Sequence, residues 1–431
     1  MRSLLLLTVI AACSPAVANF KDASPDDAAP DAPTHGMVRV KVYDPANTGA
    51  VVTGVPVVFV EADGTQVGHP VTDPDGVVTA DVHAGASATV VITTTSGTQM
   101  STLLGLKPGD DIIFGPRNGD STEAGTFTVS FQTYSGAASY VVYGPCGSTS
   151  TAGASATLDM ATRCKQDTMD VLVVAMDVNG NPIAALQKTG VAFTAGGSTS
   201  VTGTYQFVSQ FTASYTDVPA AVTSMNFSRA VPDDYGYSSF NSGTPSSGTF
   251  SASVPGPQGA TALVTTNVSN NATGGQQTIA QQIQGNALTY GMDVGTTLLP
   301  WVGQPSLDLA AHKLVIPIDN AGTSGDAPDV FFGQAAYDRG VAPNQQHFSW
   351  LVIGATPGDV TLPTLPPEVG DVMPKPTDSA LQPLAALAES DALSGYDVIR
   401  QDVFTLINSA TDPVHPQAGK TRLSVNFGGV D

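Results

Sequence analysis

The cysteines are the most informative of the few residues in this chain that could do chemistry. Three cysteines are present among 431 residues: Cys13, Cys146 and Cys164. The last two form an even pair in a chain whose N-terminus predicts export, which favours one disulfide between them. Such a bridge would add about 3 kcal/mol of stability on the chain-entropy model. Two buried thiols or a metal pair are the alternatives, and the intervening segment offers only Asp159 as a further ligand.

Histidines and carboxylates form no recognisable catalytic or metal-binding motif. Six histidines are scattered without H-x-x-x-H spacing, and neither a G-x-S-x-G elbow nor a Walker loop is present. Adjacent acids such as Asp110 and Asp111 are expected to be solvated loop residues. The sequence therefore predicts a protein that is not an enzyme and needs no cofactor or metal. A less favoured alternative is a secreted hydrolase built around His347, Asp329 and Asp338.

Four aromatic residues are candidates for ligand contact. Tyr235 and Tyr237 lie in an Asp-containing turn, where their rings could stack on a sugar. Trp301 and Trp350 are the two tryptophans of the chain, and both belong to its C-terminal part. These residues support an alternative function in carbohydrate or peptide binding. The competing interpretation is that the rings pack on their own sheets.

The N-terminus carries the pattern of an export signal. Arg2 precedes an apolar stretch from Leu4 to Ala12, and small residues follow. This stretch is too short to cross a bilayer as a helix, which needs about 20 apolar residues.

Two processing sites remain open. The run from Ile10 to Cys13 resembles a bacterial lipobox, which implies a signal peptide at 1–12 and a lipid on Cys13. The alternative is ordinary cleavage after Ala18, which removes residues 1–18 and leaves a soluble periplasmic or secreted protein. We favour the lipobox because the disulfide pair leaves Cys13 over. By resemblance to lipoprotein sorting, Ser14 after the cysteine favours the outer membrane or cell surface.

Composition limits the possible partners. Asp and Glu number 37 against 16 Lys and Arg, which gives a net charge of −21 and excludes nucleic acid as the expected partner. Residues 13–36 are rich in Ala, Pro and Asp and are expected to be a disordered acidic spacer. With 44 Gly and 31 Pro, the remaining chain favours strands and turns.

Residues 37–115 give the clearest module. Val38, Val40 and Val42 alternate with basic residues, which predicts a half-buried strand. Asp63-Gly64 is a hairpin signal, and a tight turn follows at Asp73 to Gly76. The spacing of these strands and turns resembles bacterial Ig-like and carboxypeptidase-regulatory-like β-sandwiches, a resemblance that implies fold more than function.

The remaining chain is divided into a β-sandwich with the disulfide at 120–196, a β-rich domain at 197–295 and a C-terminal β-rich domain at 296–431. No internal sequence repeat is clear, although β modules of about 80 to 100 residues fit the turn spacing. A helix is predicted over 379–394, because Leu381, Leu384, Leu387 and Ala388 share one helical face. The predicted fold class is all-β, with serial Ig-like β-sandwich domains and a short helical segment near the C-terminus.

These observations predict an exported cell-envelope protein, tethered to the membrane through its N-terminal lipid. Its expected role is that of a non-catalytic scaffold, adhesion or binding protein whose partner is an extracellular protein or a glycan.

Overall fold

The computed structural model describes residues 35–428, except for 45–48, 96, 116–122, 163–166, 232–236, 244–247, 255–260, 325, 343, 356, 382, 394 and 403–418; the side chains of 230–247 and 252–261 are likewise left out. Regular structure is almost entirely strand, which confirms the predicted all-β class. One α-helix is present in the described part, α1 (Tyr396–Ile399), near the C-terminus. None of the described helices has the length and apolar character needed to span a bilayer.

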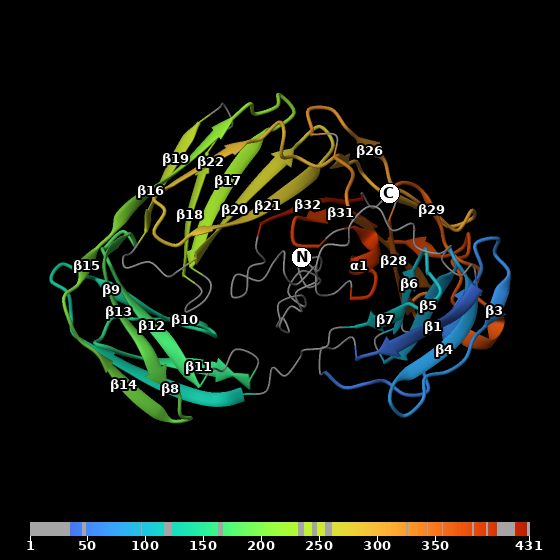
Figure 1. The fold of residues 1–431 in the computed structure, drawn as a ribbon, viewed down its shortest axis with the longest axis horizontal. Coiled ribbons are helices and arrows are strands. Elements are labelled where there is room, and N and C mark those ends of the chain that lie inside the picture. Colours follow the sequence, from blue (N-terminus) through green and yellow to red (C-terminus); the bar gives the residue numbers. More distant parts are fainter. Residues whose placement is uncertain are drawn as a thin grey trace, which may run out of the picture.

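Three seven-stranded sandwiches follow one another along the chain (Figure 1). The first sandwich contains β1 (His35–Val42), β2 (Val57–Val60), β3 (Gln66–Gly68), β4 (Val77–His83), β5 (Ser87–Thr94), β6 (Gly97–Leu103) and β7 (Asp111–Phe114). The second contains β8 (Glu123–Phe131), β9 (Ser139–Gly144), β10 (Gly147–Thr151), β11 (Ser155–Ala161), β12 (Thr168–Met176), β13 (Pro182–Ala192) and β14 (Gly197–Val201). After β15 (Gln206–Phe207), the third contains β16 (Ser209–Thr216), β17 (Ser224–Val231), β18 (Tyr237–Gly243), β19 (Thr249–Val254), β20 (Thr261–Asn270), β21 (Gly275–Gln284) and β22 (Thr289–Asp293).

The three sandwiches repeat one topology. In each, the first strand lies between the fourth strand, which is antiparallel to it, and the seventh, which is parallel: β4-β1-β7, β11-β8-β14 and β19-β16-β22. The facing sheet has the order sixth, fifth, second, third: β6-β5-β2-β3, β13-β12-β9-β10 and β21-β20-β17-β18. The sequence does not reveal this repeat, because what recurs is strand order and not residue identity.

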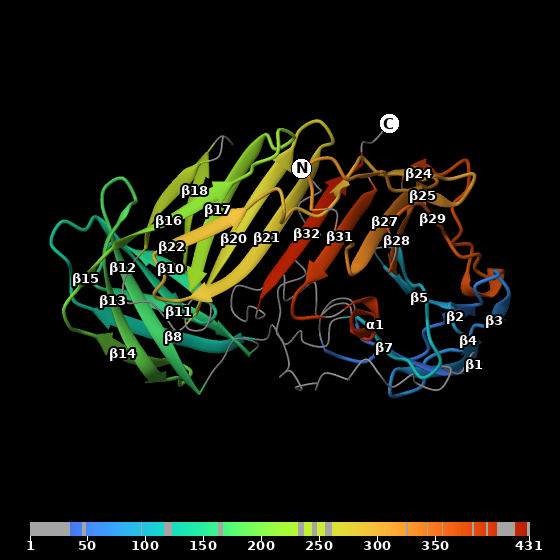
Figure 2. The same ribbon diagram turned by 45° about the horizontal axis from the view of Figure 1, so that its top comes forward.

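The C-terminal segment joins the first sandwich to the third. It comprises β23 (Trp301–Val302), β24 (Ser306–Asp308), β25 (Lys313–Val315), β26 (Ile318–Asp319), β27 (Val330–Arg339), β28 (Gln346–Gly354), β29 (Val360–Thr361), the 3-10 helix η3 (Pro367–Val369), β30 (Ser379–Ala380), β31 (Leu384–Ser390), α1 and β32 (Lys420–Phe427). Strands β32, β31, β27 and β28 lie between the edge strands β21 and β6, so one long sheet runs from β18 to β3 (Figure 2). The region predicted as a separate domain at 296–431 therefore shares its sheet with two sandwiches.

Both faces of this long sheet are apolar where it crosses the first sandwich. Val330, Phe332 and Ile353 pack on one face, against the core of the β4-β1-β7 sheet. Phe331 and Val352 point to the other face, where β23 to β26, β29 and the loop after β29 cover them. In this region the long sheet is thus the middle layer of three, between the β4-β1-β7 sheet and the short strands of the C-terminal segment. The second sandwich has its own core between its two sheets.

The helix predicted over 379–394 is wrong, because this segment forms β30 and β31. Ala385 and Leu387 face one core, and Ala386 and Ala388 face the other. A strand buried on both faces is a continuous apolar run, and such a run also contains the spacing of an amphipathic helix.

Candidate functional site

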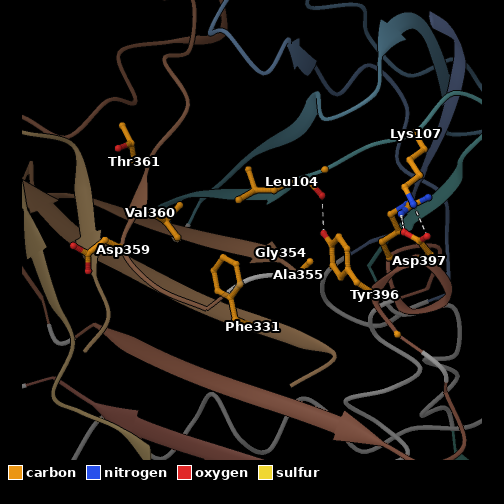
Figure 3. Close-up of a pocket in the computed structure, with 13 residues that line it drawn as sticks. Leu104, Lys107, Phe331, Gly354, Ala355, Asp359, Val360, Thr361, Tyr396 and Asp397 are labelled. Atoms are coloured by element: carbon orange, nitrogen blue, oxygen red, sulfur yellow. Dashed lines mark hydrogen bonds and ion pairs between the residues drawn. The ribbon is translucent and has the colours of Figure 1, made fainter. Parts of the chain in front are cut away.

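A pocket of about 720 Å³ lies where the first sandwich meets the C-terminal segment (Figure 3). Its walls come from the segment after β6, from β27, from the end of β28, from β29 and from α1. The lining residues are Leu104, Gly105, Lys107, Phe331, Gly354, Ala355, Asp359, Val360, Thr361, Gly395, Tyr396, Asp397 and Arg400. Its volume is in the range of small-ligand sites, which often lie at domain junctions.

The floor of the pocket depends on a glycine. Phe331 and Gly354 are paired across β27 and β28. A Cβ built on Gly354 would lie 2.4 Å from the Phe331 ring, so the ring can lie over this position only because the residue is glycine. Val360 and Leu104 add further apolar surface.

Tyr396 forms a fixed aromatic wall. Its hydroxyl donates to the Leu104 carbonyl at 2.7 Å and lies 3.2 Å from the Ile353 carbonyl. Burial raises the pKa of this phenol, so it remains neutral at physiological pH. The hydroxyl is therefore used to hold the ring in position.

Charged groups at the α1 side form a clasp, which we define as Lys107, Asp110, Asp397 and Arg400; Asp110 and Arg400 are buried, whereas Lys107 and Asp397 are exposed. Arg400 Nε and Nη2 each donate to an Asp110 carboxylate oxygen at 2.8 Å, and both side chains are about 5 % exposed. Arg400 also pairs with Asp397, which binds Lys107 in turn. The hydrogen bond from Lys107 lowers the pKa of Asp397, so this carboxyl stays ionised. The clasp fastens α1 to the start of β7.

The clasp corrects one sequence expectation. Asp110 was expected to be solvated, yet its residue is 5 % exposed, whereas the neighbouring Asp111 carries an exposed ion pair with Arg39. The sequence signal for the clasp was Tyr396-Asp397-x-x-Arg400, which places acid and base one helical turn apart.

The predicted aromatic ligand platform is not present at the tryptophans. Trp350 is fully buried in β28, and its Nε1 donates to Thr102 Oγ1 on β6 at 2.8 Å. Trp301 is fully buried in the core of the third sandwich. Neither ring offers a face to a ligand. The prediction that these two tryptophans contact a ligand is therefore wrong, and both are core residues. Tyr235 and the side chain of Tyr237 lie outside what the structure describes.

The residues of the alternative hydrolase site are only partly together. His347 Nδ1 lies 2.9 Å from Asp338 Oδ1, and these two residues are opposite each other in the β27–β28 ladder. Asp329 lies before the first residue of β27, at the far end of that strand, where it accepts the Ser390 backbone N–H. A ten-residue strand separates the two positions by about 30 Å. They do not form one site.

Cys146 lies in the turn between β9 and β10, where its Sγ accepts the Ala161 backbone N–H at 3.3 Å. Cys13 and Cys164 lie outside the described residues, so the lipid and the disulfide stay predictions. Among the described residues, no group of three or more His, Cys, Asp or Glu could hold a metal ion.

The fold defines a class of protein, one built from tandem β-sandwiches. The sequence matches no family model and no curated protein. Among solved structures it is similar to the Bacillus anthracis TIE protein, with 11 % identity over 61 % of this chain and a TM-score of 0.16; the match spans half of that protein. It is also similar to a tetra-tandem repeat in the extending region of a large adhesion protein, with 10 % identity, 92 % and 100 % coverage of the two chains and a TM-score of 0.13.

A third similar structure consists of two B repeat units of the collagen-binding protein of Staphylococcus aureus. The two proteins share 10 % identity. The match covers 75 % of this chain and 89 % of the collagen-binding structure, with a TM-score of 0.12. TM-scores this low carry no argument about function. The class assignment therefore depends on the strand order described above.

Proposed function

We propose that this chain is an exported cell-envelope protein, anchored through a lipid on Cys13, that acts as a rigid, non-catalytic scaffold for adhesion or binding. Its proposed location is the outer membrane or the cell surface, and its proposed partner is an extracellular glycan or protein. The acidic spacer at 13–36 would hold the folded part away from the membrane.

The long sheet is the observation that carries the scaffold role. Sandwiches joined by single linkers can bend at each linker. Here β32 pairs with β21 from Gln276 to Gln281, and β28 pairs with β6 from Thr98 to Leu103. Four strands and two ladders therefore fix the first sandwich relative to the third. Rigidity of this kind suits a protein that displays a binding site.

The non-catalytic part of the proposal has support in the polar groups of the pocket. Lys107 and Arg400 are both paired with Asp397, and Asp359 is paired with Lys313 at 2.7 Å. The pairing with Lys313 lowers the pKa of Asp359, so this carboxyl is ionised and is not poised as an acid near neutral pH.

The anchor is tested by the mass of the mature N-terminus, with wild type and Cys13→Ala compared in a bacterial host that processes lipoproteins. We expect wild type to begin at a diacylglyceryl Cys13 and to sediment with membranes. The variant should be cleaved after Ala18 and recovered in the soluble fraction. A wild-type N-terminus at Asn19 would overturn the anchored assignment.

A further inference from the structure

We infer that the pocket between α1 and β29 binds a neutral sugar ring. This inference rests on the proposed function: if the protein is a binding scaffold, a neutral sugar is the class of ligand that it binds. The pocket combines a volume of about 720 Å³, an aromatic wall and balanced charges (Figure 3).

Charge balance excludes ions as the preferred ligand. The lining contains two cations, Lys107 and Arg400, and two carboxylates, Asp359 and Asp397. Each is paired, and the partner residues outside the lining, Lys313 and Asp110, again contribute one charge of each sign. With equal numbers of both signs, these groups carry no net charge that would favour an anion or a cation.

The paired charges also disfavour a purely apolar ligand. An apolar group would remove water from the Lys107–Asp397 pair, whose side chains are 51 % and 60 % exposed. It would return no hydrogen bonds for the water it displaced. A hydroxyl can do so, because it accepts from an ammonium and donates to a carboxylate at the same time. The rim therefore favours a neutral ligand with several hydroxyl groups.

Sugar recognition also needs an aromatic surface for the apolar face of the ring, in addition to the ion pairs that bind its hydroxyls. Phe331 lies at the floor with only 2 % of the residue exposed, so the ring available to a ligand is that of Tyr396, the half-buried wall whose hydroxyl is held by backbone carbonyls. A fixed ring loses little conformational entropy when a ligand packs on it. The C–H face of a pyranose is apolar and flat, whereas its rim carries hydroxyls, which matches an aromatic surface flanked by ion pairs.

The test is an array of neutral, sialylated and sulfated glycans, probed with the mature protein in a detergent without a sugar headgroup. Ala355 is exposed and is labelled between Phe331 and Tyr396 in Figure 3, so Ala355→Trp should fill the pocket without disturbing the core. Thr364→Trp is the matched control, because Thr364 is exposed but does not line the pocket.

We expect binding to neutral glycans, a loss of at least about tenfold in affinity for Ala355→Trp, and wild-type affinity for Thr364→Trp. Tyr396→Phe, which keeps the ring but removes its anchor, should weaken binding less than Ala355→Trp. The inference is overturned if no neutral glycan binds, if only charged glycans bind, or if Ala355→Trp binds like wild type. Glycan binding does not depend on the lipid, so its failure in a correctly anchored protein would leave the scaffold proposal standing.

Discussion

The first and second sandwiches share a topology but differ in what lies along one edge. The sixth strand of the first sandwich, β6, is extended by β28, and the equivalent β21 of the third is extended by β32. Within the described part of the chain, the equivalent strand of the second, β13, pairs on that side only with the two residues of β15.

Local features of β13 protect the part of its edge that β15 does not cover. Its register with β12 shifts between Met169 and Val171, and the Gly190 N–H donates to the Asp170 side chain. Lys188 Nζ reaches across to Thr199 and Ser200 on β14. A bulge and a lysine are two common ways to blunt an exposed edge. By contrast, neither β6 nor β21 contains a charged residue. In the second sandwich, the edge strand is therefore protected from further pairing by its own bulge and lysine. In the first and third sandwiches, the equivalent edge is covered by strands of the C-terminal segment.

This comparison divides the molecule into two parts for stability. One is the second sandwich. The other, which we call the long-sheet region, comprises the first and third sandwiches with the C-terminal segment. Both tryptophans, Trp301 and Trp350, belong to the long-sheet region, so tryptophan fluorescence reports its unfolding and not that of the second sandwich.

The largest effect is expected from the clasp. Arg400→Met leaves the buried Asp110 carboxylate without a countercharge, with the Lys107 backbone N–H as a remaining donor, and should lower the free energy of unfolding of the long-sheet region by about 3–5 kcal/mol. Urea unfolding followed by tryptophan fluorescence measures this loss. The double variant Arg400→Met with Asp110→Leu should recover much of it, because the buried charge is gone. The exposed Arg39–Asp111 pair is the control, since Arg39→Ala should cost under about 1 kcal/mol. An equal loss from Arg39→Ala would contradict the account.

Two matched methionines test whether the parts unfold separately. Met100 on β6 and Met160 on β11 are both 1 % exposed, so truncation to Ala should cost about 2–5 kcal/mol at either site. Met100→Ala should shift the tryptophan transition, whereas Met160→Ala should leave it unchanged and shift only the part of the tyrosine signal that comes from the second sandwich, with Tyr134, Tyr140, Tyr143 and Tyr205. A shift of the tryptophan transition by Met160→Ala would mean that the second sandwich is not independent.

The predicted disulfide should stabilise only the second sandwich. Cys146→Ser is expected to lower its free energy of unfolding by about 3 kcal/mol and leave the tryptophan transition in place. Wild type with a reducing agent should behave like the variant. Mass spectrometry that finds both thiols free in the secreted protein would refute the pairing.

Acid should weaken the long-sheet region more than the second sandwich. Hydrogen bonds from Lys107 and Arg422 lower the pKa of Asp397 and Asp326 below the ordinary 3.8. Such a carboxyl stabilises the fold above pH 3.8, and this contribution is lost as the pH falls through its folded pKa. Burial raises the pKa of Asp329, which contributes with the opposite sign. In the second sandwich the N–H of Asn181 lowers the pKa of Asp177, a solvent-exposed turn residue. Thermal unfolding from pH 5 to about 2 should therefore move the tryptophan transition further than the tyrosine one.

A strand or a site can be predicted from the sequence only when its pattern lies within one short segment of the chain. The strand at Val38 to Val42 alternates on one buried face and was predicted directly. β31 is buried on both faces, so its period carried no strand signal and a helix was predicted in its place. The pocket unites Leu104, Phe331 and Tyr396, which are brought together by the pairing of β28 with both β6 and β27 and by the hydrogen bonds of Tyr396. No local pattern encodes that pairing, although the uncharged edge of β6 was a usable hint.

The central claim is that the long-sheet region opens as one cooperative unit. Hydrogen exchange by mass spectrometry at increasing, sub-denaturing urea tests it most directly, because exchange resolves each strand. We expect β5 and β6 of the first sandwich to lose protection at the same urea concentration as β20 and β21 of the third, while β9 and β12 of the second follow a separate curve. Separate curves for β6 and β21 would contradict it.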